Sequence, residues 1–126
     1  MPKIRPQGDF PFIEEYRKVF EITDQTIFAG GDSIYTNYPL TPDLLVHELV
    51  HLRQQEEHGL IEWVHDFLYD PEFRLRQELE AYKEQLKSIK DRNHRNKVRI
   101  ESAQKLSSGL YGNIISTADA FQLMKV

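Results

Sequence analysis

The sequence predicts an α+β fold, with a small β-rich segment followed by a series of helices. Residues 10–28 are rich in aromatic and β-branched side chains, and residues 26–37 contain the pair Gly30-Gly31, which is typical of a tight turn between strands. From Thr41 onward, apolar residues recur at helical spacing. At 126 residues the chain has the size of one domain with one core, so residues 1–126 are expected to form a single domain.

The N-terminal part is expected to hold a small antiparallel sheet. Residues 1–9, which include two prolines and a glycine, are expected to form an irregular arm. Lys18–Ile22 alternates polar and apolar residues as a half-buried strand does, although a helix is also possible for Phe12–Phe20. Thr26–Asn37 is predicted to form two short strands around the glycine turn.

Helices are expected in the rest of the chain. Thr41 is a favourable N-cap residue, Pro42 suits the first helical position and Gly59 is a typical stop, so the first helix should end at His58. The further expected helices are Leu60–Asp70, Pro71–Lys90, Asn96–Leu106 and Thr117–Met124. On the second of these, apolar residues three or four apart predict a core-facing seam of Leu75, Leu79, Tyr82, Leu86 and Ile89.

Composition and charge exclude several functions. The chain has no cysteine, which excludes disulfides, thiolate metal sites and a cysteine nucleophile, so any metal must be held by His, Asp or Glu. The formal charge of −4 argues against a nucleic-acid partner. The basic run Lys87–Arg99 is expected to be a solvated connection, because no aromatic residues lie within it. No apolar run is long enough for a signal peptide or a membrane span, so no membrane partner is expected.

The segment His47–His51, HELVH, is the main candidate for a functional site. On a helix, residues four apart lie on one face with Cβ atoms about 6 Å apart, so both imidazoles can bind one metal ion. Glu48 lies about 100° around the helix from His47, where it can border the ion and accept a proton from a metal-bound water. The alternative is an amphipathic helix with two surface histidines. The face expected to anchor this helix in the core consists of Leu45, Leu49 and Leu52.

A metal site that activates water usually has three protein ligands and an open position, so a third ligand is expected. On the Pro71–Lys90 helix, Glu78 lies about 60° from the centre of the apolar seam and can face a neighbouring helix at the edge of the core. Glu80 lies about 140° away and is expected to be solvated. His58 is about 10 Å along the helix axis from His51, too far for the same ion, and is expected to stabilise the helix C-terminus.

The two motifs together resemble a known family. HELVH followed by Glu78-Leu79-Glu80-Ala81 resembles the gluzincin branch of the zincin metallopeptidases, in which the glutamate of a downstream Glu-x-x-Ala or Glu-x-x-Ser is the third ligand. The whole chain resembles small stand-alone metallopeptidase-like proteins of phages and bacteria. The resemblance is specific over Thr41–Leu86, although an Asp or Asn usually follows the second motif where this chain has Tyr82.

This resemblance implies a minimal zincin-like fold, with a small sheet, an active-site helix, a glutamate helix and further helices. It also implies a Zn²⁺ cofactor held by His47, His51 and Glu78, and a metallopeptidase in which Glu48 is the general base for a metal-activated water. The partner would be a peptide or protein substrate, cleaved as by an endopeptidase. The expected location is the cytoplasm of a bacterium or of a phage-infected host cell.

The family suggests further roles outside the two motifs. In zincins an edge strand before the active-site helix pairs with an extended substrate, and the residues in the corresponding place are Ser33, Ile34, Tyr35 and Thr36. The sequence does not choose the oxyanion donor among its candidates His65, Tyr38, Tyr82 and Tyr111. Two other functions are also compatible with the sequence. One is a zincin-like protein that binds metal and a protein partner without hydrolysing it, and the other is a helical interaction protein without metal.

Overall fold

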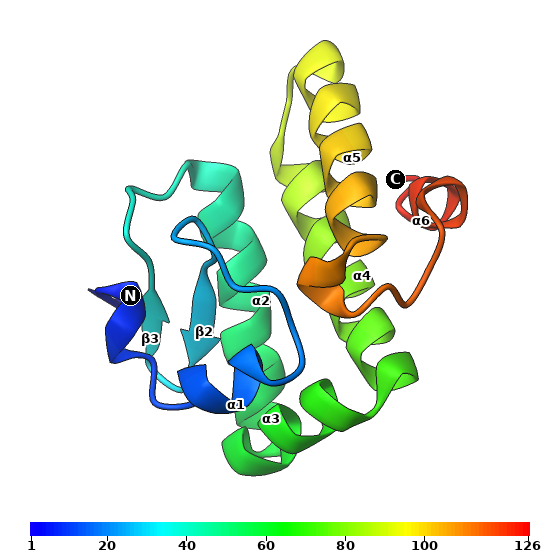
Figure 1. Cartoon of the computed structure of the whole chain (residues 1–126). Coiled ribbons are helices and arrows are strands. Elements are labelled where there is room, and N and C mark those ends of the chain that lie inside the picture. Colours follow the sequence, from blue (N-terminus) through cyan, green and yellow to red (C-terminus); the bar gives the residue numbers. More distant parts are fainter.

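The computed structural model describes residues 1–126 and has the expected α+β architecture. In chain order its elements are β1 (Lys3–Arg5), the 3₁₀ turn η1 (Gln7–Asp9), α1 (Ile13–Arg17), β2 (Phe28–Gly30), β3 (Ser33–Tyr35), α2 (Pro42–His58), α3 (Leu60–Tyr69), α4 (Pro71–Ser88), α5 (Arg92–Leu106), the 3₁₀ turn η2 (Gly109–Tyr111) and α6 (Thr117–Leu123). The sheet, α1 and α2 lie on one side of the molecule and α4, α5 and α6 on the other, while α3 joins the two sides at one end (Figure 1). None of the helices combines the length and apolar character needed to cross a membrane.

The sheet is mixed, with strand order β1-β3-β2. Strands β2 and β3 are antiparallel, with Ala29 opposite Ile34, and Gly31 between them has a φ of 63°, which glycine adopts without strain. This pair confirms the expected hairpin. The third strand was not expected, because β1 lies in residues 1–9 and pairs in parallel with β3. All three of its side chains are exposed, so its sequence lacks the alternation that marks a half-buried strand.

The strand predicted at Lys18–Ile22 is wrong. The short helix α1 ends at Arg17, within the segment for which a helix was the alternative prediction, and residues 18–22 follow it as turns and irregular chain. The Phe20 amide donates to the Tyr16 carbonyl at 2.8 Å just beyond the end of that helix. Tyr16 and Phe20 are four residues apart, and both side chains are buried in one aromatic cluster. The helical spacing of these two rings therefore prevails over the local alternation of polar and apolar residues.

The expected helix boundaries are confirmed where a local cap defines them. Gly59, with a φ of 94°, ends α2, and the Asp70 carboxylate accepts from the amides of Glu72 and Phe73 at the start of α4. Helix α5 begins at Arg92, before the expected Asn96, because Asp91 caps it by accepting from the His94 amide at 2.8 Å. Within the basic run, Arg95 donates to the Ile89 carbonyl and so ties α5 to the end of α4.

Two hydrophobic clusters lie on either side of the contact between α2 and α4. The first is mostly aromatic and joins the sheet and α1 to α3; it includes Phe10, Tyr16, Phe28, Trp63 and Phe67. The second joins α4, α5 and α6 and includes Tyr82, Leu86, Ala103, Leu106 and Met124, with the predicted seam residues Leu75 and Leu79 packed against it. Helices α2 and α4 form the most extensive contact between any two elements, so the space between the clusters is built mainly by these two helices.

The expected apolar anchor of α2 is wrong in its details. Leu49 is 37% exposed, and Leu45 and Leu52 are only half-buried. The buried face of α2 is instead almost entirely polar, and its residues are His47, Glu48, Val50, His51, Gln54 and Gln55. This helix is therefore held in place by hydrogen bonds and ion pairs to a larger extent than by apolar packing.

Gln55 attaches α2 to the sheet. Its amide nitrogen donates to the Ala29 carbonyl at 2.8 Å, and its amide oxygen accepts from the Gly31 amide at 2.8 Å. The side chain is only 2% exposed, so water cannot replace either bond. One glutamine thereby satisfies two backbone groups of the β2–β3 hairpin and fixes its distance from α2.

We expect Gln55→Ala to lower the free energy of unfolding by about 2–4 kcal/mol, because two buried backbone groups lose their partners. Urea denaturation followed by circular dichroism measures this loss. The control is Gln104→Ala, on the exposed surface of α5, which should change stability by less than about 0.5 kcal/mol. Equal effects of the two substitutions would show that Gln55 does not anchor the hairpin.

Candidate functional site

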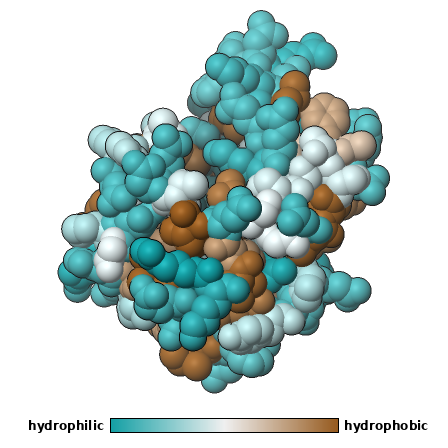
Figure 2. All heavy atoms as spheres, in the orientation of Figure 1, coloured by the Kyte–Doolittle hydropathy of each residue, from teal (hydrophilic) through white to brown (hydrophobic).

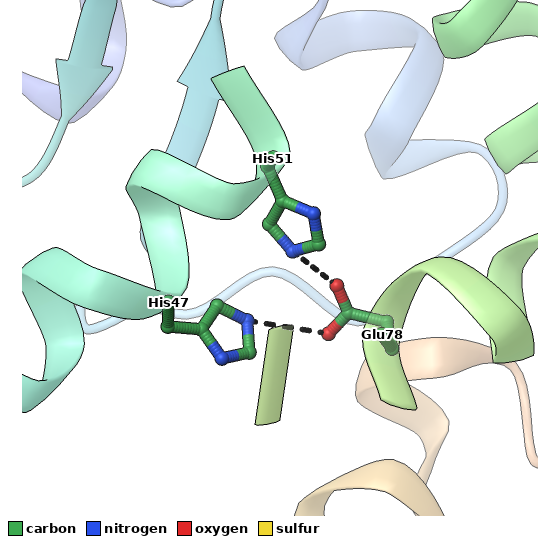
Figure 3. A group of neighbouring side chains, drawn as sticks. All are labelled: His47, His51 and Glu78. Atoms are coloured by element: carbon green, nitrogen blue, oxygen red, sulfur yellow. Dashed lines mark ion pairs between the residues drawn. The ribbon is translucent and has the colours of Figure 1, made fainter. Parts of the chain in front are cut away.

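The three predicted ligands come together between α2 and α4. His47 and His51 project from α2, and Glu78 projects from α4 toward both (Figure 3). One possible ligand atom from each of the three side chains lies within 4.8 Å of the other two. His47 Nε2 lies 3.6 Å from Glu78 Oε2, and His51 Nε2 forms an ion pair with Glu78 Oε1. The arrangement is that of a group that could hold one metal ion.

All three side chains are buried, which excludes an ordinary helix with two surface histidines. His47 is 4%, His51 5% and Glu78 1% exposed. Burial alone would lower the pKa of His51, but the charge of Glu78 and its hydrogen bond raise that pKa to about 9. Burial alone would raise the pKa of Glu78, but the positive charge of His51 and the close approach of both imidazoles hold that pKa far below its usual value. Without a metal, the cluster is therefore a buried ion pair.

A glutamine on α4 orients His47. The Nδ1 atom of His47 lies 2.9 Å from Gln85 Oε1, and Gln85 Nε2 donates to Asp43 Oδ2 at 2.7 Å. An ionised carboxylate only accepts hydrogen bonds, so the amide nitrogen of Gln85 must face Asp43 and its oxygen must face the histidine. Hydrogen bonds from Gln85 and Thr41 lower the pKa of Asp43 despite its partial burial, which keeps that carboxylate ionised.

A second glutamine orients His51 in the same way. Its Nδ1 lies 2.8 Å from Gln54 Oε1, and Gln54 Nε2 donates to Glu80 Oε1 at 2.7 Å and to the Gln77 carbonyl at 3.1 Å. Glu80 is exposed, as expected of a solvated carboxylate, and it also accepts this bond and pairs with Arg53 at 3.1 Å. Each of the two histidines is therefore hydrogen-bonded to a carboxamide, which is in turn hydrogen-bonded to a carboxylate.

These contacts prepare the cluster for a metal ion. When Nδ1 of each histidine donates to a glutamine oxygen, the neutral ring carries its lone pair on Nε2, the atom that faces Glu78. The Glu78 Oε2 atom is fully buried and has no hydrogen-bond partner in the protein. A buried carboxylate oxygen without a donor is rare, and a cation between the three side chains would satisfy it. The donor set therefore fits a metal.

Glu48 borders the cluster without belonging to it, as the helix geometry predicts. Its Oε2 atom lies 4.0 Å from His47 Nε2, and the side chain is 5% exposed. Burial raises the pKa of Glu48 above its usual value, with a further contribution from Glu78, against the opposing charges of the two histidines. A carboxylate with a raised pKa is a stronger base, so Glu48 is suited to accept a proton in this position.

The cluster opens into a cavity of about 760 Å³, which Glu48 also lines. One wall comes from residues between Ile22 and Ala29, and the opposite wall from α5, whose lining residues include His94, Val98, Ser102 and Lys105. The face in Figure 2 is largely hydrophilic, with apolar side chains gathered at its centre between the two sides of the molecule. A cavity of this volume is typical of small-molecule and peptide sites.

The expected substrate strand needs a correction. Ser33–Thr36 was expected to be an edge strand, but β3 is the central strand and pairs with a neighbour on each side. Ser33 and Ile34 are fully buried, and of the four expected residues only Thr36 lines the cavity. The strand beside the cavity is β2, through Phe28 and Ala29. The unexpected third strand β1 is what moves β3 into the middle of the sheet.

The four candidate oxyanion donors lie in different places. His65 is largely exposed, contacts Asp66 and does not line the cavity. Tyr38 lines the cavity, but it is half-exposed and donates to Asp24 at 2.8 Å. Tyr82 and Tyr111 line the cavity beside the cluster, with their hydroxyl oxygens 2.8 Å apart and the Tyr82 ring centroid 4.4 Å from that of His47.

His58 lies outside the cluster, as expected. It lies in the last turn of α2, and its Nε2 atom is 2.8 Å from Oδ2 of Asp66 on α3.

Sequence reasoning missed Gln54 and Gln85, although a positional signal exists for both. Gln54 follows His47 by seven residues and His51 by three, and Gln85 follows Glu78 by seven, so each lies on the face of its helix that carries a ligand. They supply the polar partners of the two histidines.

Comparison of the chain with models of known protein families, with curated proteins and with solved structures found no match.

We expect Gln85→Leu and Gln54→Leu each to weaken the binding of a divalent metal ion, measured with Zn²⁺, by about 10- to 100-fold, because the histidine loses the acceptor that fixes its ring and tautomer. Competition with a chromophoric chelator measures the affinity. Gln104→Leu, on the exposed side of α5, is the control and should leave the affinity unchanged. If the two buried substitutions changed zinc affinity less than twofold, the glutamines would have no role in orienting the histidines.

The metal-free protein should lose stability as the pH rises from about 6.5 to about 9. The pKa of His51 rises from 6.5 to about 9 on folding, so the stability that its charge contributes is complete below pH 6.5 and lost by about pH 9. The pKa of Glu78 falls on folding, so the stability that its charge contributes is complete above pH 4.5. Urea denaturation in EDTA at pH 6 and pH 9 measures the difference, which should largely vanish in Glu78→Gln. Equal stability of the parent at both pH values would contradict the ion pair.

Proposed function

We propose that the protein is a zinc-dependent metallopeptidase, with His47, His51 and Glu78 as zinc ligands and Glu48 as general base. The observation that carries this proposal is the convergence of the three buried ligand atoms within 4.8 Å at a cavity that Glu48 also lines. The resemblance of HELVH and Glu78-Leu79-Glu80-Ala81 to the gluzincin motifs supports the same assignment.

The donor set is compatible with zinc, and the resemblance of HELVH to the zincin motif favours zinc over iron(II), which uses the same three ligand types. Two imidazoles and one carboxylate are the protein ligands of a typical catalytic zinc site, which keeps one position open. Calcium and magnesium prefer sites built from oxygen alone, and thiolate-dependent ions have no ligand in a chain without cysteine. When bound, zinc supplies a Lewis acid for amide hydrolysis.

Glu48 performs the proton transfers of the proposed reaction. Its carboxylate is held on a rigid helix, is shielded from bulk water and borders the ligand cluster. It takes a proton from the attacking water and delivers it to the leaving amine. Tyr82 and Tyr111 offer protonated hydroxyls beside His47, where they can donate to the developing oxyanion.

The cavity supports a peptide as the substrate. Its volume of about 760 Å³ accommodates several residues, and β2 borders it through Phe28 and Ala29. An extended peptide between β2 and α5 would pass over the ligand cluster, in contact with Glu48.

We expect Glu48→Gln to reduce peptide hydrolysis by at least about 100-fold while the protein keeps about one zinc per chain, because the substitution removes the base and no ligand. Elemental mass spectrometry measures the zinc, and mass spectrometry of a tryptic peptide mixture incubated with the protein measures cleavage. The control is His51→Ala, which should lose both zinc and hydrolysis.

Three results would contradict the proposal in different ways. A parent without zinc, even after incubation with the ion, would exclude the metal site. A parent that holds zinc and cleaves no peptide would favour the non-hydrolysing metal-binding protein. Unchanged hydrolysis in Glu48→Gln would exclude Glu48 as the base.

A further inference from the structure

Tyr16 is a buried tyrosine that the proposed mechanism does not use. It comes from α1, far in sequence from the two motifs, and only 6% of it is exposed. It lines the same cavity as His47, Glu48, His51 and Glu78. Its ring centroid lies 6.0 Å from that of Phe67, which in turn lies 6.3 Å from the ring of His51. Tyr16 therefore approaches the cluster from the His51 side, while Tyr82 lies beside His47.

The Tyr16 ring is held rigidly. Besides Phe67, its neighbours are Phe10, Phe20 and Phe28, with centroids 5.0, 5.7 and 5.4 Å away, each in an edge-to-face arrangement. Such packing allows little movement of the ring, so the hydroxyl occupies one position.

The Tyr16 hydroxyl is free to bind a ligand. It makes no hydrogen bond within the protein, unlike Tyr82 and Tyr111, which bond to each other. The hydroxyl oxygen is also not completely shielded from solvent. Two fully buried side-chain atoms lack a hydrogen-bond partner, Arg74 Nε and Glu78 Oε2, and the unpaired Tyr16 oxygen is not one of them. A buried tyrosine normally finds a partner for its hydroxyl, so an unpaired hydroxyl on a residue that lines the cavity marks a place for an external acceptor.

The surroundings select a neutral acceptor. Burial raises the pKa of Tyr16 far above its usual value, so the hydroxyl is protonated and donates. A protonated hydroxyl set among aromatic rings can donate to a neutral acceptor without the free-energy cost of burying a further charge. The acceptor best suited to this position is a carbonyl oxygen.

We propose that the Tyr16 hydroxyl binds a backbone carbonyl of the peptide substrate and positions the peptide in the cavity on the His51 side of the ligand cluster. This inference rests on the proposed peptidase function. Tyr16 is a positioning residue that makes the same contact in the bound substrate and in the transition state, so its loss affects substrate binding more than the chemical step.

The test compares two tyrosines of the same aromatic cluster. Tyr35 is buried to a similar extent, with its ring 5.4 Å from that of Phe10, but it does not line the cavity. Tyr16→Phe and Tyr35→Phe each remove one hydroxyl and keep the ring. For the peptide cleaved fastest from the tryptic mixture, we expect Tyr16→Phe to raise KM about fivefold with kcat within twofold, and Tyr35→Phe to change neither.

A second readout separates contact from a purely structural effect. Each backbone carbonyl of that peptide is replaced in turn by a thiocarbonyl, whose sulfur is a weaker acceptor. At the carbonyl that Tyr16 binds, the replacement should raise KM for the parent and have no further effect on Tyr16→Phe, which is the coupling expected of two groups in contact.

Several outcomes would overturn the inference. These are an unchanged KM in Tyr16→Phe, a fall in kcat without a rise in KM, the same rise in Tyr35→Phe, and the absence of coupling at every carbonyl. In each of these cases the parent still cleaves the peptide, so the proposed function stands. A zinc-loaded parent that cleaves nothing in the mixture is the separate result that removes the proposed function, and the role of Tyr16 with it.

Discussion

The burial of Glu78 between His47 and His51 is the constraint on which the rest of the structure depends. Three ionisable side chains in the interior are strongly unfavourable unless each is paired and hydrogen-bonded. Here they lie where α2 and α4 cross, and each histidine leads through a glutamine to a carboxylate nearer the surface. The two helices can therefore pack closely only in the register that brings these partners together.

This requirement explains the unusual character of α2. A helix at the centre of a small domain usually turns an apolar face to the core, whereas α2 buries histidines, glutamines and a glutamate and leaves Leu49 partly exposed. Gln55 extends the polar contacts to the sheet, and apolar packing is provided by the clusters on either side. The rigidity of the site thus comes from hydrogen bonds whose geometry is directional, which suits side chains that must hold fixed positions.

What could be predicted from the sequence depended on how local the interactions are. Gly59 and Pro71 mark helix ends because such signals involve only neighbouring residues, and the spacing of His47 and His51 placed two candidate ligands on one face. Glu78 was found from its angle to the apolar seam. In contrast, β1 pairs through its backbone with exposed side chains, so no pattern marked it. The partners of Gln54 and Gln85 depend on how α2 packs against α4, which one-dimensional periodicity does not describe.

The position of the ligands on two helices has a thermodynamic consequence. His47 and His51 lie on the helix that Gln55 joins to the sheet, while Glu78 belongs to the helix whose later turns enter the second cluster. An ion held by all three side chains is a cross-link between the two walls of the cavity. The three side chains can hold one ion only when the two walls are at a particular distance, so a ligand that favours this distance strengthens metal binding. By linkage, the metal strengthens the binding of that ligand by the same factor.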